Sequence, residues 1–155
     1  MISEIVKKQI IEAMKAKDEL RKSTLKMLSS ALHNAEIAKQ GVLTEEEELD
    51  IANKEAKKRK DAIEAIRLAQ SKPTQNRPDL DDRIDKENSE LNILKEFLPQ
   101  ELSNKELEKL VSESISQTKA KDMKDMGKVI GLVMGTAKGR ADGGKVAELV
   151  KRKLS

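Results

Sequence analysis

The chain has 155 residues, of which 38% are charged and 1% aromatic, with no Cys, Trp or Tyr, one Phe and one His. These absences exclude disulfide frameworks, thiolate or multi-histidine metal sites, and the RNA-binding folds that stack bases on aromatic rings. Aromatic side chains also favour strands, so we expect an all-α protein with an aliphatic core, no metal and no cofactor.

Basic charge is concentrated towards the end of the sequence. Lys and Arg total 31 and Asp and Glu total 28, which gives a net charge of +3. Residues 119–155 contain ten basic and four acidic residues, a net charge of +6, so the preceding 118 residues carry a net charge of −3. A regional basic excess is the electrostatic footprint of a polyanionic partner.

The first residues bear on the location of the protein. Residues 1–20 mix apolar with charged side chains and contain no uninterrupted apolar segment like that of a secretory signal peptide. No run in the sequence approaches the roughly 18 apolar residues of a transmembrane helix. We therefore expect a cytoplasmic protein that does not associate with membranes.

The first 98 residues show the three- and four-residue apolar spacing of amphipathic helices. Asp18 is expected to cap the start of one helix, and Gly41 to mark its end. Thr44 and Glu47 form the pattern of a capping box. The polar segment 71–78 contains two prolines and is expected to separate two helices. The predicted helices cover residues 2–17, 20–40, 44–70 and 80–98.

After Pro99 the predicted helices are shorter and the glycine content rises. Ser103 and Glu106 form a second capping box, and Asp125 and Asp142 are expected to cap the two helices that follow. The predicted helices cover residues 103–115, 125–134 and 146–154. The predicted architecture is therefore a four-helix N-terminal region with long antiparallel helices, residues 1–98, followed by a small three-helix domain, residues 99–155.

Gly127, Gly131 and Gly135 recur every four residues within one predicted helix. Three glycines inside a helix cost about 2–3 kcal/mol relative to alanine, so the arrangement needs a compensating interaction. A helix face without side chains permits the close approach of another helix of this chain, or of a protein or RNA backbone from outside. Packing of another helix is the favoured interpretation, and approach by an outside backbone is the alternative.

A glycine-rich segment precedes the last helix. Residues 139–146 nearly match a phosphate-binding loop, but Val146 stands where Ser or Thr would bind magnesium, and no strand precedes the segment. We therefore expect a glycine turn between two helices. If this turn contacts an anion, Lys138, Arg140 and Lys145 are the candidates.

The densest basic run, Lys-Lys-Arg-Lys at residues 57–60, falls within a predicted helix. Four consecutive helical residues spread around the helix axis, and acidic neighbours at helical spacing offset their charge. A solvated face is therefore favoured over an anion-binding patch. No set of residues predicts catalysis, because His33 has no fixed partner and no carboxylate is isolated in an apolar stretch.

Three stretches form recognisable motifs: Glu-x-x-Glu followed by Phe-Leu-Pro-Gln-Glu-Leu-Ser in residues 87–103, Asp-Met-Gly-Lys-Val-Ile-Gly in residues 125–131, and Lys-Gly-Arg-Ala-Asp-Gly in residues 138–143. Their order and spacing resemble the signatures of the YqeY-like proteins. That family is related to the C-terminal tail of GatB, the tRNA-binding subunit of glutamine-dependent tRNA amidotransferases. Phe97 takes the place usually held by Tyr, and the resemblance covers essentially the whole chain.

The resemblance implies a two-part all-helical protein whose C-terminal part is similar to a domain that contacts tRNA. In the amidotransferase, a carbon–nitrogen ligase with glutamine as amide donor, that domain is not the catalytic centre. Nothing similar to the amidase or activating parts is present in this sequence. The resemblance therefore implies association with that activity class, and we do not expect this chain to perform the reaction.

Two functional hypotheses follow. The first is a non-catalytic accessory protein that binds tRNA or another structured RNA, with basic side chains on the phosphates and the glycine face allowing close approach. The second is a module that docks on a partner enzyme; an enzyme acting alone is least favoured. The candidate RNA contacts are Lys128, Lys138, Arg140, Lys145, Lys151 and Arg152, and the close-approach face is Gly127, Gly131 and Gly135.

Overall fold

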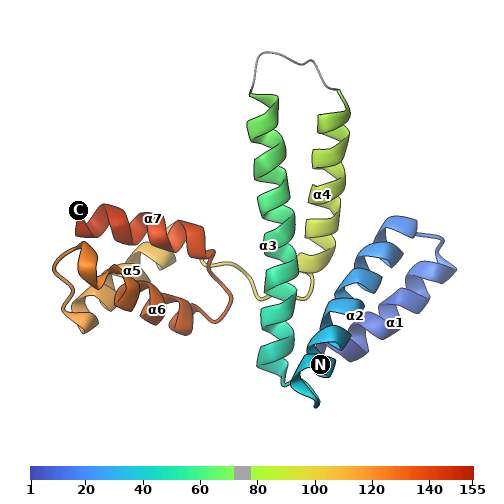
Figure 1. Ribbon diagram of the computed structural model, residues 1–155, viewed down its shortest axis with the longest axis horizontal. Helices are drawn as coiled ribbons and strands as arrows, with labels where there is room; N and C mark the ends of the chain where they lie inside the picture. The colour runs from blue at the N-terminus through green and yellow to red at the C-terminus, as the bar shows by residue number, and fades with distance from the viewer. Residues whose placement is uncertain (72–77) are drawn as a thin grey trace. The chain divides into compact units, whose positions relative to one another are not determined.

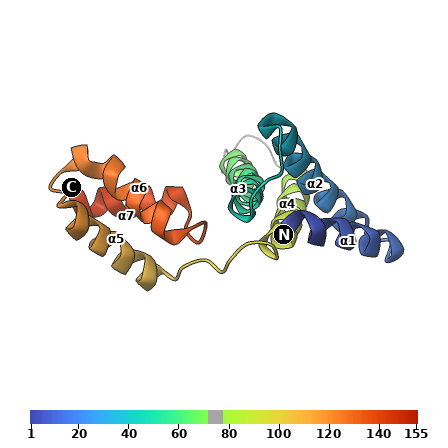
Figure 2. The same cartoon turned by 90° about the horizontal axis from the view of Figure 1, so that it is seen from below.

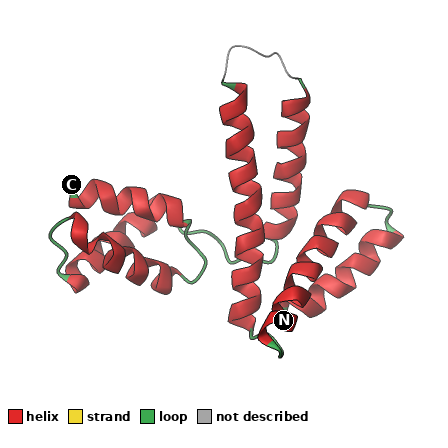
Figure 3. Cartoon of the chain, viewed as in Figure 1, coloured by secondary structure: helices red, strands yellow, loops and turns green. Residues whose placement is uncertain are grey.

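The structure is a computed structural model that describes residues 1–71 and 78–155. Most of the polar segment predicted at residues 71–78 therefore lies outside the described residues. Within the described ranges the chain forms helices joined by loops, and no strand (Figure 3). The all-α prediction is confirmed.

The chain divides into two compact units, Met1–Leu98 and Pro99–Ser155, which we call the N-terminal and C-terminal units. Figure 1 labels the helices of both. The N-terminal unit contains α1 (Ile2–Lys15), α2 (Glu19–Lys39), α3 (Glu45–Gln70) and α4 (Asp79–Lys95). The C-terminal unit contains α5 (Asn104–Thr118), a short 3-10 helix η1 (Met123–Asp125), α6 (Met126–Ala137) and α7 (Gly143–Leu154).

The N-terminal unit consists of two helical hairpins, α1 with α2 and α3 with α4 (Figure 1). Both hairpins contribute to one aliphatic core, because α2 packs against α3 and α4 as well as against α1. Leu25, Leu28 and Leu94 are among its fully buried side chains, and Phe97 packs half-buried against it. Burial of aliphatic surface therefore holds the two hairpins together.

Local signals placed several helix starts correctly. The Asp18 side chain accepts a hydrogen bond from the Arg21 N–H at 3.0 Å, and the Thr44–Glu47 capping box is present at the start of α3. The predicted end of α2 near Gln40 and Gly41 is confirmed, and Gln40 rather than the glycine takes the left-handed conformation, with φ of 58°. The Gly41 N–H instead bonds to a carbonyl five residues earlier, which closes the last turn.

The start of α1 is capped from another helix. Its N-cap residue, Met1, offers no side-chain hydrogen bond. Glu48, in the first turn of α3, is 1% exposed, and its Oε2 atom accepts the N–H of Ile2 at 2.6 Å and that of Ser3 at 3.4 Å. A carboxylate at a helix N-terminus satisfies free N–H groups and opposes the positive end of the helix dipole.

One residue of the predicted basic run lies inside the N-terminal unit. Arg59 is buried between α3 and α4, with its Nε atom 2.8 Å from the Glu90 carboxylate. The Glu55 and Glu87 carboxylates lie 3.7 Å and 3.8 Å from its guanidinium nitrogens. Among the described residues, neither Arg59 Nε nor Glu87 Oε2 has a partner of good hydrogen-bond geometry, so these attractions are mainly electrostatic.

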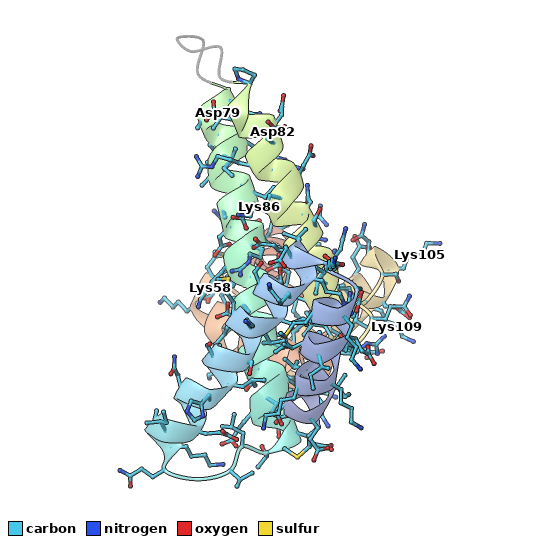
Figure 4. The ribbon with its side chains drawn as sticks, turned by 90° about the vertical axis from the view of Figure 1, so that its right-hand side faces the viewer. Lys58, Asp79, Asp82, Lys86, Lys105 and Lys109 are labelled. Atoms are coloured by element: carbon cyan, nitrogen blue, oxygen red, sulfur yellow. The ribbon has the colours of Figure 1, made fainter. Side chains whose placement is uncertain are left out.

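The expectation of a uniformly solvated basic face is therefore wrong at Arg59. It holds for Lys58, which is 66% exposed on α3 and pairs with Glu55 (Figure 4). The same figure shows Asp79 and Asp82 at the N-terminal end of α4, where their negative charge interacts favourably with the positive end of the helix dipole.

An ion pair ties the end of α4 to the first hairpin. The Arg21 guanidinium donates to both oxygens of Glu96, at 3.0 Å and 2.6 Å, and to the Gln9 side chain at 2.8 Å. Hydrogen bonding from Arg21 lowers the pKa of the Glu96 carboxyl below its ordinary value of 4.5, although partial burial opposes the shift.

This lowered pKa predicts an acid-dependent loss of stability. The pKa of Glu96 is lower in the folded protein than in the unfolded chain. The ion pair therefore contributes fully to the free energy of unfolding above pH 4.5, and this contribution is lost as the pH falls below that value. Urea denaturation should therefore show wild type more stable than Glu96→Gln at pH 6, with the gap narrowing towards pH 3. A gap that is independent of pH would contradict the assignment.

The C-terminal unit packs α5, α6 and α7 around a second aliphatic core, which includes Val111, Val129 and Val146 (Figure 2). The Ser103–Glu106 capping box at the start of α5 is confirmed. Asp125 stands before α6 as predicted but does not cap it. Its carboxylate accepts the Lys121 N–H at 3.1 Å instead, because the turn of η1 directs the side chain back along the chain.

Candidate nucleic-acid interface

The turn between α6 and α7 is set by its own sequence. Lys138 ends α6 in the left-handed conformation, with φ of 47°, and Gly139 follows with φ of 80°. The Asp142 side chain accepts the Gly144 N–H at 3.0 Å and caps α7, as predicted. The turn is therefore closed by backbone geometry and a carboxylate, and its left-handed conformation explains the glycine at position 139.

Arg140 fastens this turn to the segment that leads into α5. Its Nε atom donates to the Gln100 carbonyl at 2.8 Å, and its own carbonyl accepts the Leu102 N–H at 2.8 Å. Two of the motifs noted in the sequence, in residues 87–103 and 138–143, thus meet through Arg140. Arg140 therefore has a structural role, besides contributing positive charge to the surface.

The outer face of α6 is almost bare of side chains. Gly127, Gly131 and Gly135 are exposed, and a Cβ atom built on any of them meets nothing within 4 Å among the described residues. Close packing of another helix, the interpretation that the sequence favoured, is therefore not seen within the C-terminal unit. The backbone of α6 is open to approach.

The free space around the glycines of α6 leads to a prediction about stability. Gly131→Ala should raise the free energy of unfolding of the C-terminal unit by about 0.5–1 kcal/mol, because alanine is the better helix former and its Cβ has free space. Thermal unfolding followed by circular dichroism checks it. A destabilised variant would mean that the face is occupied in solution.

The helix α6 contains no acidic residue, and Asp122 and Asp125 flank Lys124 in the turn before it. Lys128 is the single charged residue of α6, and it is exposed beside the glycines. Lys124 in η1 and Lys138 at the C-terminal end of α6 are also exposed and extend the positive charge beyond both ends of the helix. Lys124 was not among the candidates, although it belongs to the basic region 119–155 that the charge count identified.

The candidates on α7 lie in a mixed-charge setting. Lys145 and Arg152 are seven residues apart and share one side of the helix, whereas Lys151 lies about 100° around the axis from Arg152. Glu148 is within one turn of all three. Arg152 also pairs with Glu108 of α5 at 3.5 Å. Their positive charge is therefore partly offset.

The surface of α5 is likewise mixed. Figure 4 shows Lys105 and Lys109 projecting from this helix, and Lys109 lies 4.0 Å from Glu113. Lys128 and Lys138 thus lie on and beside a helix without acidic residues, and Lys124 extends this surface next to Asp122 and Asp125. We call this surface, with the three glycines, the α6 face.

The described residues hold no cluster of three or more His, Cys, Asp or Glu side chains that could bind a metal ion. A helix long and apolar enough to cross a membrane is also not found within residues 1–71 and 78–155.

Comparison with known proteins gives a family match and several relatives. Residues 3–154 match the family described as Yqey-like protein. An uncharacterised protein of Schizosaccharomyces pombe is 34% identical over 100 residues, 64% of this chain and 74% of the relative. Altered inheritance of mitochondria protein 41 is 37% identical in Lachancea thermotolerans, over 74% of this chain, and 34% identical in Saccharomyces cerevisiae, over 62%.

These relatives correct the predicted location. The two yeast proteins are named as mitochondrial, so the expectation of a cytoplasmic protein is contradicted. The expectation relied on the lack of a secretory signal and of a transmembrane run, and neither feature distinguishes one non-secretory compartment from another. The aligned part spans 58% and 48% of these two relatives, about half of their length.

Proposed function

Since the chain belongs to the family of YqeY-like proteins, we propose that it binds tRNA or another structured RNA through its C-terminal unit, as an accessory protein without catalytic activity of its own. The observation that carries this proposal is the α6 face. It combines an exposed backbone, without side chains at three glycines, with lysines at both ends and no acidic residue within α6 itself.

The mechanism we propose is electrostatic and depends on shape. Lys128 and Lys138 contact phosphates on either side of the glycines, so that a sugar–phosphate backbone lies against α6 more closely than side chains would permit. Arg140 holds the turn that presents Lys138 and adds its own charge. Lys145, Lys151 and Arg152 on α7 make outlying contacts. A chain with one aromatic residue reads backbone shape rather than stacked bases.

The resemblance to the amidotransferase tail suggests where such binding would act. We propose an association with glutamine-dependent amide transfer on tRNA, in which this chain contributes RNA contact and another protein contributes the chemistry. The whole-chain match to the YqeY-like family supports membership, and the link to the ligase rests on the resemblance alone.

Fluorescence anisotropy with labelled tRNA over a salt series tests the proposal. The double variant Lys128→Ala/Lys138→Ala should weaken binding and reduce the slope of log affinity against log salt by about 2, one phosphate contact per lysine. The matched control is Lys8→Ala/Lys15→Ala, which removes the same charge from exposed positions of α1. Equal effects of the two double variants, or no binding at low salt, would overturn the proposal.

A second variant tests the shape of the face without altering charge. Gly131→Leu should weaken tRNA binding because its side chain stands in the path of the approaching backbone, while Gly131→Ala should weaken it much less. Unchanged binding by the leucine variant would remove the glycines from the proposed interface.

The glycine spacing also favours a second candidate, a docking site for a helix of a partner protein. Small residues every four positions allow two helices to approach closely. A pull-down with and without ribonuclease separates the candidates. Partners that are lost on ribonuclease treatment support RNA binding, and partners that are retained but lost with Gly131→Leu support protein docking.

A further inference from the structure

Besides three carboxylates, the buried guanidinium of Arg59 contacts a thioether sulfur. Met27 of α2 is 50% exposed, and its sulfur accepts a hydrogen bond from Arg59 Nη2 at 3.5 Å. The other sides of the guanidinium face carboxylates of α3 and α4, since Nε lies against Glu90 and Nη1 against Glu55. Met27 is therefore the point at which α2 joins the charge cluster of the second hairpin.

This contact pairs a strong donor with a weak acceptor. A thioether sulfur accepts hydrogen bonds poorly, whereas a guanidinium N–H is a charged donor. The side chain of Arg59 is 8% exposed, so water has little access to supply a better acceptor. Oxidation of the sulfur would place a polar oxygen, a stronger acceptor, next to Arg59 Nη2.

We propose that Met27 is a reversible oxidation site at which hydrogen peroxide strengthens the contact between α2 and α3. The thioether sulfur attacks one peroxide oxygen, the O–O bond breaks, the sulfur becomes a sulfoxide, and the other oxygen leaves as water. The sulfur loses two electrons and the peroxide gains them. Methionine sulfoxide reductase reverses the change. The chain contains six Met and no Cys, so thioethers are its sulfur groups.

The sign of the effect distinguishes this site from ordinary oxidative damage. Oxidation of a core methionine destabilises a protein because a polar group enters apolar packing. Met27 is half-exposed and already faces a charged donor, so the sulfoxide oxygen gains a charge-assisted hydrogen bond from Arg59 at little cost in apolar burial. Oxidation here should therefore slow the opening of the N-terminal unit.

Hydrogen exchange of the full chain, read by mass spectrometry, tests the proposal. Wild type and Met27→Leu are each compared before and after treatment with hydrogen peroxide, and peptide mapping records which methionines are oxidised. Met14, which is 55% exposed on α1, is the internal reference for access of the oxidant. We expect peroxide to slow exchange of the α3 amides about fivefold more in wild type than in Met27→Leu.

Met27→Gln provides an independent measurement, because its amide oxygen offers Arg59 a permanent acceptor. Its α3 amides should exchange more slowly than those of Met27→Leu without any peroxide. The proposal is overturned if Met14 is converted while Met27 stays reduced, if oxidised wild type exchanges as fast as oxidised Met27→Leu, or if Met27→Gln gives no protection.

Discussion

Replacing Arg59 by alanine is expected to lower the free energy of unfolding of the N-terminal unit by about 3–5 kcal/mol. The substitution leaves the carboxylates of Glu55, Glu87 and Glu90 close together without the guanidinium that lies between them. Removing one partner of a buried ion pair is costly because the remaining charge is neither solvated nor compensated. A loss of this size is a large part of the stability of a domain of about 100 residues.

Urea denaturation followed by circular dichroism measures this loss, since the chain has no Trp or Tyr to report by fluorescence. Lys57→Ala is the matched control, because it removes a neighbouring exposed charge of α3 and should change the stability by no more than about 0.5 kcal/mol. Arg59→Met combined with Glu90→Leu should recover much of the loss, because two apolar side chains then replace the closest charged pair.

If Arg59→Ala and Lys57→Ala differed by less than about 1 kcal/mol, the cluster would not be the electrostatic link between α3 and α4 that the distances indicate. The explanation by an uncompensated carboxylate would also be contradicted if the Arg59→Met/Glu90→Leu variant were less stable than Arg59→Ala alone. That result would mean that Glu90 contributes through contacts other than its pairing with Arg59.

The ion pairs of Arg59 are a feature of the fold that the sequence did not predict. The buried positions of α3 include 52, 56, 63 and 66, all apolar, and Arg59 lies on the same stripe, three residues after Ala56 and four before Ile63. Its spacing therefore marked it as an inward position. A search for apolar residues passed over it, and its partners Glu87 and Glu90 belong to α4, so nothing within α3 indicated how the charge would be compensated.

Features that depend on neighbours in the sequence were predicted well. The capping boxes of α3 and α5 and the caps at Asp18 and Asp142 need three or four consecutive residues, and all are present. Asp125 failed as a cap because it is the last residue of the 3-10 turn η1, which the sequence did not reveal, and its carboxylate accepts the Lys121 N–H instead. Local chemistry is readable when the backbone on both sides is regular.

The candidate interface was predicted in part from the sequence, less completely than the helix caps and more completely than the Arg59 ion pairs. The basic region and the glycine spacing are properties of the sequence, and the exposure of Lys128 follows from helix periodicity. Whether another helix covers Gly131 is a question of tertiary packing, and the structure shows open space there. The role of Arg140 in holding residues 100–102 was likewise hidden, because its partners lie 40 residues earlier in the sequence.

Glu48→Ala should lower the free energy of unfolding of the N-terminal unit by about 2–3 kcal/mol. The carboxylate is 1% exposed and accepts the N–H groups of Ile2 and Ser3. Alanine leaves both donors without their acceptor, removes a negative charge from the positive end of the α1 dipole, and opens space beside the core. Glu48→Gln should cost less, since its amide oxygen still accepts one hydrogen bond.

The control for this prediction is Glu46→Ala, which removes an exposed carboxylate from the same first turn of α3. It changes the charge near the α3 dipole equally but touches no atom of α1, so we expect a cost of about 0.5 kcal/mol. Urea denaturation gives the comparison for all three variants. If Glu48→Ala cost no more than Glu46→Ala, Glu48 would act on its own helix alone, and the link between α1 and α3 would rest on apolar packing.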